Sequence, residues 1–83
     1  MAEVRISNHA REQMKDRGIT EEMVLGIISS PQQIIPQGPE KVIYQSVKYF
    51  EEEKRNFLVR VFVNIIKQPN LVITVYRTST LPY

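Results

Sequence analysis

Residues 57–79 read FLVRVFVNIIKQPNLVITVYRTS and contain the two clearest β-strands of the chain. Both are rich in Val, Ile, Thr, Phe and Tyr, the residue types that favour a pleated, half-buried strand. The pattern predicts strands at Phe57–Ile65 and Leu71–Ser79, with Pro69 in the loop between them. Because a short loop joins antiparallel neighbours, these two strands predict an antiparallel pair.

Two more strands are predicted upstream of this pair. Val42–Phe50 is one of them, and the polar turn 51–56 separates it from the next strand. Gln33–Ile35 is a short edge strand, closed by Pro36 and Gly38. The second half of the chain therefore predicts a meander of three to four strands.

The first thirty residues have the helical period instead. Ser7 and Thr20 are residues that cap helix N-termini, and they predict helices over Asn8–Arg17 and from Glu21 onward. Gly18 ends the first helix and Ser30-Pro31 ends the second. The apolar positions that share a helix face are Ala10, Met14, Met23, Val24, Ile27 and Ile28. We therefore expect an α+β fold: one domain, residues 1–83, with both helices packed on one face of the antiparallel sheet.

Composition limits the classes of function. The 83 residues suffice for one domain, and the hydrophobic content of 42% allows a genuine core. There is no cysteine and a single histidine, His9, so the sequence predicts no disulfide, no structural zinc site and no metal or other cofactor. The chain has no apolar run near the ~20 residues that span a membrane. The start, Met1 to Arg5, lacks the pattern of a secretory signal, so we expect a cytoplasmic protein.

Strand alternation separates a helix-facing side of the sheet from an open side. We expect all-aliphatic rows to face the helices, because a slip of one residue would turn a row to water. These rows are Val59, Val61 and Val63; Leu71, Ile73 and Val75; and Ile43 with Val47. Pairing Ile65 with Leu71 brings the rows to one side, and Arg60 then lies opposite Tyr76.

The open side then carries a polar patch of two cations, two phenols and two hydroxyls. Its predicted members are Tyr44, Ser46, Lys48, Arg60, Tyr76 and Thr78. Guanidinium and ammonium groups bind phosphate, and phenol rings stack on bases or donate hydrogen bonds to them. The patch therefore indicates a surface for RNA, and the small net charge of +2 is compatible with such a partner.

Two short motifs carry a resemblance to a known group of proteins. The N-terminal part has His9-Ala10 and Arg17-Gly18-Ile19 before a helix that starts with two glutamates, and the end reads ITVYRTS over residues 73–79. Over roughly residues 6 to 79 the chain resembles an uncharacterised family of small prokaryotic proteins that is grouped with RelE, barnase and EndoU-type ribonuclease toxin folds. The resemblance implies a RelE-like fold. It also implies a site built from the N-terminal helix and the open sheet face, here His9, Arg17, Arg60, Tyr76 and Thr78.

Together with the polar patch, the resemblance implies a metal-independent endoribonuclease toxin that cleaves RNA by attack of the substrate's own 2′-hydroxyl. His9 is the natural proton carrier, since the unperturbed pKa of histidine is about 6.5. Arg60 stabilises the charge on the reacting phosphate, and Tyr76 positions the substrate or carries the second proton. The RNA- and phosphate-binding residues are Arg17, Lys48, Ser46, Thr78 and Tyr44. The expected partners are RNA, free or on the ribosome, and a small antitoxin protein.

Other interpretations remain open at this stage. His9 is equally a helix-cap or surface residue, Arg17 complements a helix C-terminus, and Arg60 with Tyr76 is equally a packing contact. A second hypothesis is a non-catalytic module of the same fold that binds RNA or protein. A third is a homodimer subunit, for which Leu58, Phe62 and Val72 would supply exposed apolar area. The tail, residues 81–83, either crosses the open face or marks a truncation.

Overall fold

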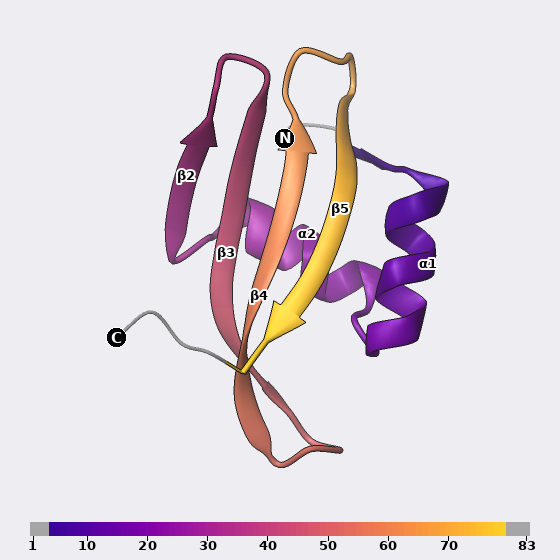
Figure 1. Cartoon of the computed structure of the whole chain (residues 1–83), viewed down its shortest axis with the longest axis vertical. Helices are drawn as coiled ribbons and strands as arrows, with labels where there is room; N and C mark the ends of the chain where they lie inside the picture. Colours follow the sequence, from indigo (N-terminus) through magenta and orange to yellow (C-terminus); the bar gives the residue numbers. More distant parts are fainter. Residues whose placement is uncertain (1–3, 80–83) are drawn as a thin grey trace.

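Five strands form one mixed sheet, and two helices lie on the same side of it (Figure 1). The computed structural model describes residues 4–79. In chain order the elements are β1 (Val4–Ile6), α1 (Asn8–Arg17), α2 (Glu21–Ser29), β2 (Gln33–Gln37), β3 (Lys41–Phe50), β4 (Arg55–Asn64) and β5 (Asn70–Thr78). Across the sheet the strand order is β1-β5-β4-β3-β2. The predicted α+β class with two N-terminal helices is confirmed.

Capping side chains fix where both helices begin. The Ser7 hydroxyl accepts a hydrogen bond from the Ala10 amide, and the Thr20 hydroxyl accepts one from the Met23 amide, each at 3.1 Å. These bonds satisfy first-turn amides that have no partner within the helix. Gly18 ends α1 with φ 66°, a left-handed conformation that glycine adopts without steric cost. The helices predicted from the caps are confirmed.

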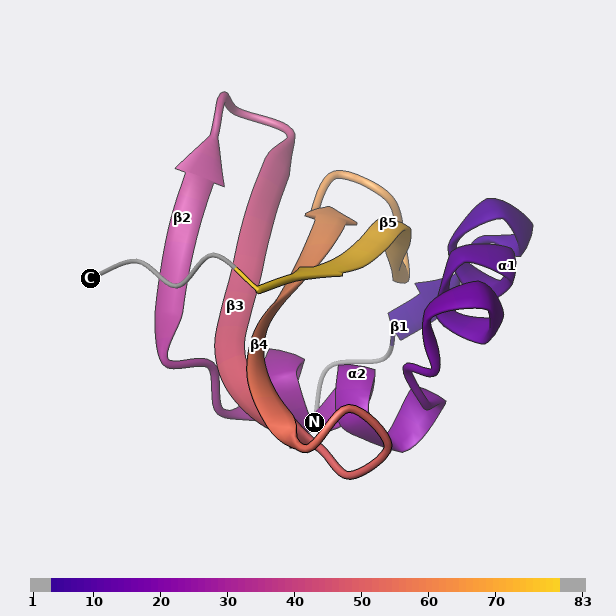
Figure 2. The ribbon, with the colours of Figure 1, turned by 60° about the horizontal axis from the view of Figure 1, so that its bottom comes forward.

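The core lies between the helices and one face of the sheet, called here the helix face (Figure 2). Val24 and Ile27 of α2 and Ala10 and Met14 of α1 are buried against it, as their spacing predicts. The sheet contributes five fully or almost fully buried valines from β4 and β5, which are Val59, Val61, Val63, Val72 and Val75. Burial of apolar surface at about 25 cal/mol per Å² is the main stabilising term of such a fold.

The N-terminal strand was not predicted, and it makes the sheet mixed rather than purely antiparallel. β1 pairs with β5 in parallel, with Ile6 opposite Val72, and the Ser7 amide extends this pairing by donating to the Val72 carbonyl at 3.0 Å. Three residues give too little pattern for a strand to be recognised in sequence. Further along β5, the Gln13 side chain of α1 accepts a hydrogen bond from the Val75 amide at 2.9 Å.

The face predicted for β3 is wrong. Tyr44 lies opposite Val61, Ser46 opposite Val59 and Lys48 opposite Phe57, so all three share the helix face with the valine row. Phe50 pairs with Arg55 across a four-residue turn, which joins even positions of β3 to odd positions of β4. Aliphatic content suggested the opposite phase, but turn length fixes the register of a hairpin.

A bulge corrects the prediction for the start of β5. Leu71 pairs with Asn64 rather than Ile65, and the pairing shifts by one residue between Phe62 and Val63. The shift turns Val72 inward, where it is 0% exposed. Leu71 and Ile73 remain only half-buried. A bulge leaves one residue of β5 unpaired, so the alternation of side chains between the two faces of the sheet changes phase there.

Two of the residues expected to be exposed apolar surface are buried. Val72 belongs to the core, and Leu58 is 7% exposed on the other face of the sheet, which is called here the open face. Only Phe62 of the predicted trio keeps a half-buried side chain. The apolar area that suggested a homodimer is therefore absent from these positions.

Neither described helix is long and apolar enough to cross a membrane. The tail, for which we predicted either a path across the open face or a truncation, lies outside the described residues 4–79.

Ile27→Ala should lower the free energy of unfolding by about 2–5 kcal/mol, because Ile27 is 0% exposed and its removal leaves a cavity in the core. Ile34→Ala is the matched control: Ile34 is 57% exposed, and we expect a change within about 0.5 kcal/mol. Urea unfolding followed by circular dichroism measures both. Equal losses for the two variants would contradict this assignment of the core.

Candidate functional site

Arg60 and Tyr76 lie side by side on the open face, as predicted. They are directly opposite each other in the β4–β5 register, and the Arg60 Nη1 group donates a hydrogen bond of 2.6 Å to the Tyr76 hydroxyl. Both side chains are half-buried. The sheet therefore holds a guanidinium and a phenol together at its surface.

This pair belongs to a longer polar row that crosses four strands. Gln33 of β2 lies opposite Gln45 of β3, Gln45 lies opposite Arg60 of β4, and Arg60 lies opposite Tyr76 of β5. Their side chains are joined in the same order. Arg60 Nε donates to Gln45 Oε1 at 2.9 Å, and Gln45 Nε2 donates to Gln33 Oε1 at 2.6 Å. We call these four residues the open-face row.

Gln33 and Gln45 were missed by sequence reasoning. The prediction placed Ser46 and Lys48 in one patch with Arg60, whereas Gln45 is the residue that lies opposite Arg60, and it is only 4% exposed. A buried glutamine needs hydrogen-bond partners, and the only sequence signal was one amide in a row of Ile43 and Val47. This single amide does not indicate a partner in sequence, because its position opposite Arg60 depends on the β3–β4 register.

Two aromatic rings stand against the guanidinium. Phe62 and Tyr76 are stacked at a centroid distance of 5.8 Å and an interplanar angle of 28°. The Arg60 guanidinium carbon lies 5.4 Å from the Phe62 centroid and 5.7 Å from the Tyr76 centroid. Contacts of this kind hold a cation in place and provide flat apolar surface for a base.

No carboxylate neutralises Arg60 among the described residues. The ion pairs of residues 4–79 are Arg11 with Glu21 and Arg77 with Glu53, both away from the open-face row. A fixed guanidinium without a counter-charge is a binding group for phosphate or carboxylate, because its planar N–H groups match two oxygens at once.

The helix residues predicted for the site are not brought to this pair. His9 is exposed in the first turn of α1, beside the Val72 end of β5. Tyr76 is four residues beyond Val72 on β5, which is about 13 Å in an extended strand. Its side chain lies on the open face, whereas α1 packs on the helix face. Arg17 is half-buried at the end of α1, where its Nη1 lies 3.5 Å from the Gln13 carbonyl.

The strand residues predicted for the site divide between the two faces. Thr78 lies opposite Leu58, two residues from Tyr76 on the open face, as predicted. Tyr44, Ser46 and Lys48 lie on the helix face, which corrects their prediction as neighbours of Arg60. Ser46 is 3% exposed, and its hydroxyl accepts a hydrogen bond from the Gln32 amide at 3.0 Å.

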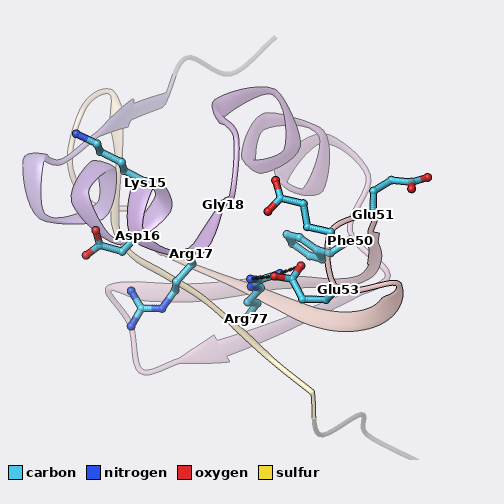
Figure 3. Close-up of a pocket in the computed structure, with 9 residues that line it drawn as sticks. Lys15, Asp16, Arg17, Gly18, Phe50, Glu51, Glu53 and Arg77 are labelled. Carbon is cyan, nitrogen blue, oxygen red and sulfur yellow. Dashed lines mark hydrogen bonds and ion pairs between the residues drawn. The ribbon is translucent and has the colours of Figure 1, made fainter.

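A hollow of about 500 Å³ opens on the other side of the molecule, between the end of α1 and the β3–β4 turn (Figure 3). Its lining combines cations and carboxylates: Lys15, Asp16, Arg17, Gly18, Phe50, Glu51, Glu52, Glu53 and Arg77. Arg77 makes a bidentate ion pair with Glu53, at 3.1 and 3.0 Å, and lies 4.2 Å from the Phe50 ring centre. Its cation is therefore already bound within the protein.

The chemistry available at the open-face row is that of hydrogen-bond donors and one hydroxyl. Residues 4–79 contain no cluster of three His, Cys, Asp or Glu side chains that could hold a metal ion. Arg60 supplies a permanent positive charge, and Tyr76 supplies a hydroxyl that both donates and accepts. Such a set can bind an anion and transfer a proton.

Comparison with known proteins identifies a family. A family model described as "Domain of unknown function (DUF4258)" matches residues 6–77. Searches of the curated proteins and of the solved structures gave no significant match.

We expect acid to loosen the β3–β4 turn. The hydrogen bonds from Arg77 hold the pKa of the Glu53 carboxyl below its ordinary value. A lowered pKa in the folded state means that the ion pair stabilises the fold above the ordinary pKa, and that this contribution is lost as the pH falls through the lowered one. Amide resonances of the turn, followed by NMR from pH 7 to pH 2, should shift over that range.

Glu53→Gln should abolish this shift, whereas Glu51→Gln, in the same turn, should leave it in place. A pH response that survives in Glu53→Gln would show that another group is responsible.

Proposed function

Because the chain belongs to the DUF4258 family, whose description assigns no activity, we propose a function from the site itself: an endoribonuclease that binds unpaired RNA on the open sheet face. The observation that supports this proposal is the Arg60–Tyr76 pair, a cation that has no counter-charge among residues 4–79, is hydrogen-bonded to a phenol and is flanked by Phe62. Phosphate on the guanidinium and a base against the rings is the combination by which proteins bind single strands.

The proposed reaction uses the 2′-hydroxyl of the substrate as its nucleophile. The 2′-oxygen of the RNA attacks the adjacent phosphorus and loses its proton, while the bond from phosphorus to the 5′-oxygen breaks and that oxygen takes up a proton. The products are a 2′,3′-cyclic phosphate and a 5′-hydroxyl. Arg60 stabilises the negative charge that develops on the phosphate oxygens. The Tyr76 hydroxyl is within reach of the same phosphate and donates the proton to the leaving oxygen.

A non-catalytic RNA-binding module is the second candidate, and the position of His9 favours it. His9, the proton carrier predicted from sequence, lies at the start of α1 near Val72, which is about 13 Å along β5 from Tyr76. Helix α1 packs on the helix face, whereas Tyr76 lies on the open face. In the catalytic proposal the proton of the 2′-hydroxyl therefore passes to solvent, or to a group of the ribosome when cleavage takes place there. In the second candidate Arg60 and Tyr76 bind RNA and cleave nothing.

We also propose that the domain is RelE-like and acts as a cytoplasmic toxin with a small antitoxin partner. Two helices on one side of an antiparallel-rich sheet, with a cationic open face, agree with the group that the sequence resembles. An antitoxin would act by covering the open-face row, and a chain segment with carboxylates is the natural complement to Arg60.

Purified protein should cleave an unstructured RNA in EDTA and leave 2′,3′-cyclic or 3′-phosphate ends, alone or with translating ribosomes. Arg60→Ala should lower the cleavage rate about 100-fold or more, because the developing charge loses its fixed donor. Tyr76→Phe should lower it by a similar factor if the phenol donates the proton. Gel analysis of end-labelled RNA measures the rates.

Arg5→Ala is the matched control, because Arg5 is an exposed arginine of β1. This variant should cleave RNA at the same rate as the unchanged protein. His9→Ala tests which residues carry out the cleavage: cleavage that is retained in this variant assigns the chemistry to the open face. RNA that binds through Arg60 and stays intact, also on ribosomes, identifies the binding module. A protein that neither binds nor cleaves RNA, alone or with ribosomes, would refute the proposed function.

A further inference from the structure

The hydrogen bonds of the open-face row have a direction. A guanidinium carries five N–H donors and no acceptor, so whatever touches Arg60 must accept. Gln45 therefore presents Oε1 to Arg60 Nε, and Tyr76 presents its hydroxyl oxygen to Arg60 Nη1. Because Gln45 has used its oxygen, its Nε2 group must donate, and it donates to Gln33 Oε1. One cation thus orients both amides.

Both ends of the row present protons to solvent as a result. Gln33 accepts with its oxygen, and its exposed Nε2 group keeps two N–H donors for an external partner. The Tyr76 oxygen accepts from Arg60, and its own O–H proton is directed away from the guanidinium. Gln45, at 4% exposed, cannot reach a ligand and acts by orienting Gln33.

From this polarity we infer that Gln33 is a second contact for the RNA of the proposed function, and that Gln45 is the positioning residue that turns the Gln33 amide outward as a donor. The inference rests on the proposed RNA site and extends it. The row becomes a line of donors across four strands, and its ligand is a chain with hydrogen-bond acceptors at repeated intervals, as a single-stranded RNA has along its phosphates and base edges.

The distance between the two contacts sets the size of the ligand. Adjacent strands are about 4.8 Å apart, so Gln33 on β2 and Arg60 on β4 are separated by about 10 Å. Inorganic phosphate on Arg60 is too small to reach Gln33. An oligonucleotide that crosses the strands reaches both, so Gln33 should matter for the oligonucleotide and not for phosphate.

Gln33→Glu tests the contact between Gln33 and the oligonucleotide, because it replaces the side-chain nitrogen with an oxygen and changes little else in the shape of the residue. The substituted side chain still accepts from Gln45 Nε2, and it presents a carboxylate where the amide donors stood. We expect a uridine tetranucleotide to bind at least tenfold more weakly, because a donor is replaced by a like charge. Inorganic phosphate, titrated against the Arg60 side-chain resonance by NMR, should bind as it does to the unchanged protein.

Gln37→Glu is the matched control, because Gln37 is an exposed glutamine of the same strand and adds the same charge outside the row. Gln33→Leu removes the donor without adding charge and should cost a few-fold in tetranucleotide affinity. Gln45→Leu should reproduce the loss seen with Gln33→Leu while the fold, measured by unfolding, is retained.

The outcomes separate this inference from the proposed function. Tetranucleotide binding that needs Arg60 but is equally strong in Gln33→Glu and Gln37→Glu overturns the Gln33 contact and leaves the proposed function standing. A loss in Gln33→Glu that is matched by an equal loss in phosphate binding overturns it as well. A tetranucleotide that does not bind to the unchanged protein overturns both.

Discussion

The pairing of β3 with β4 is the constraint on which the rest of the molecule depends. The turn between Phe50 and Arg55 joins even positions of one strand to odd positions of the other, and this phase decides which side chains meet the helices. Tyr44 and Ser46 are thereby committed to the core side, and Gln45 is placed against Arg60. A turn longer or shorter by one residue would exchange the two faces of β3 and place Arg60 opposite Ser46 or Tyr44 instead of Gln45.

Burial of Gln45 within the polar row is tolerated because both groups of its amide have a hydrogen-bond partner. An unpaired amide at the exposure of Gln45 would destabilise the fold by roughly 1–3 kcal/mol, whereas an amide with both groups engaged costs little. Among the described residues no buried side-chain nitrogen or oxygen lacks a hydrogen bond. The same bonds that stabilise the row also remove the rotational freedom of Arg60, so a ligand meets a guanidinium that is already oriented.

Local signals in the sequence predicted the helices and most of the strands. The composition of the site depends on strand register, which is set by contacts between residues far apart in the chain. Caps and apolar spacing identified both helices, because these signals act within one turn. Arg60 and Tyr76 were placed together correctly, since the bulge of β5 lies beyond Phe62 and leaves their pairing untouched. Gln45 was missed because aliphatic content, rather than turn length, was used to set the phase of β3. The ion pair between Arg77 and Glu53 was not predicted, because the two residues are 24 positions apart in the sequence.

The two margins of the sheet are finished differently, with a consequence for self-association. On one margin lies β1, a parallel strand of three residues, and further along β5 the Val75 amide donates to the Gln13 side-chain oxygen of α1. On the far margin, β2 carries no charge to repel an incoming strand, and Pro36 lacks the N–H that would extend a ladder. Edge-to-edge stacking of many copies needs two receptive margins on each molecule. Within the described residues one margin is a three-residue strand and the other is interrupted by a proline, and both features disfavour growth into fibres.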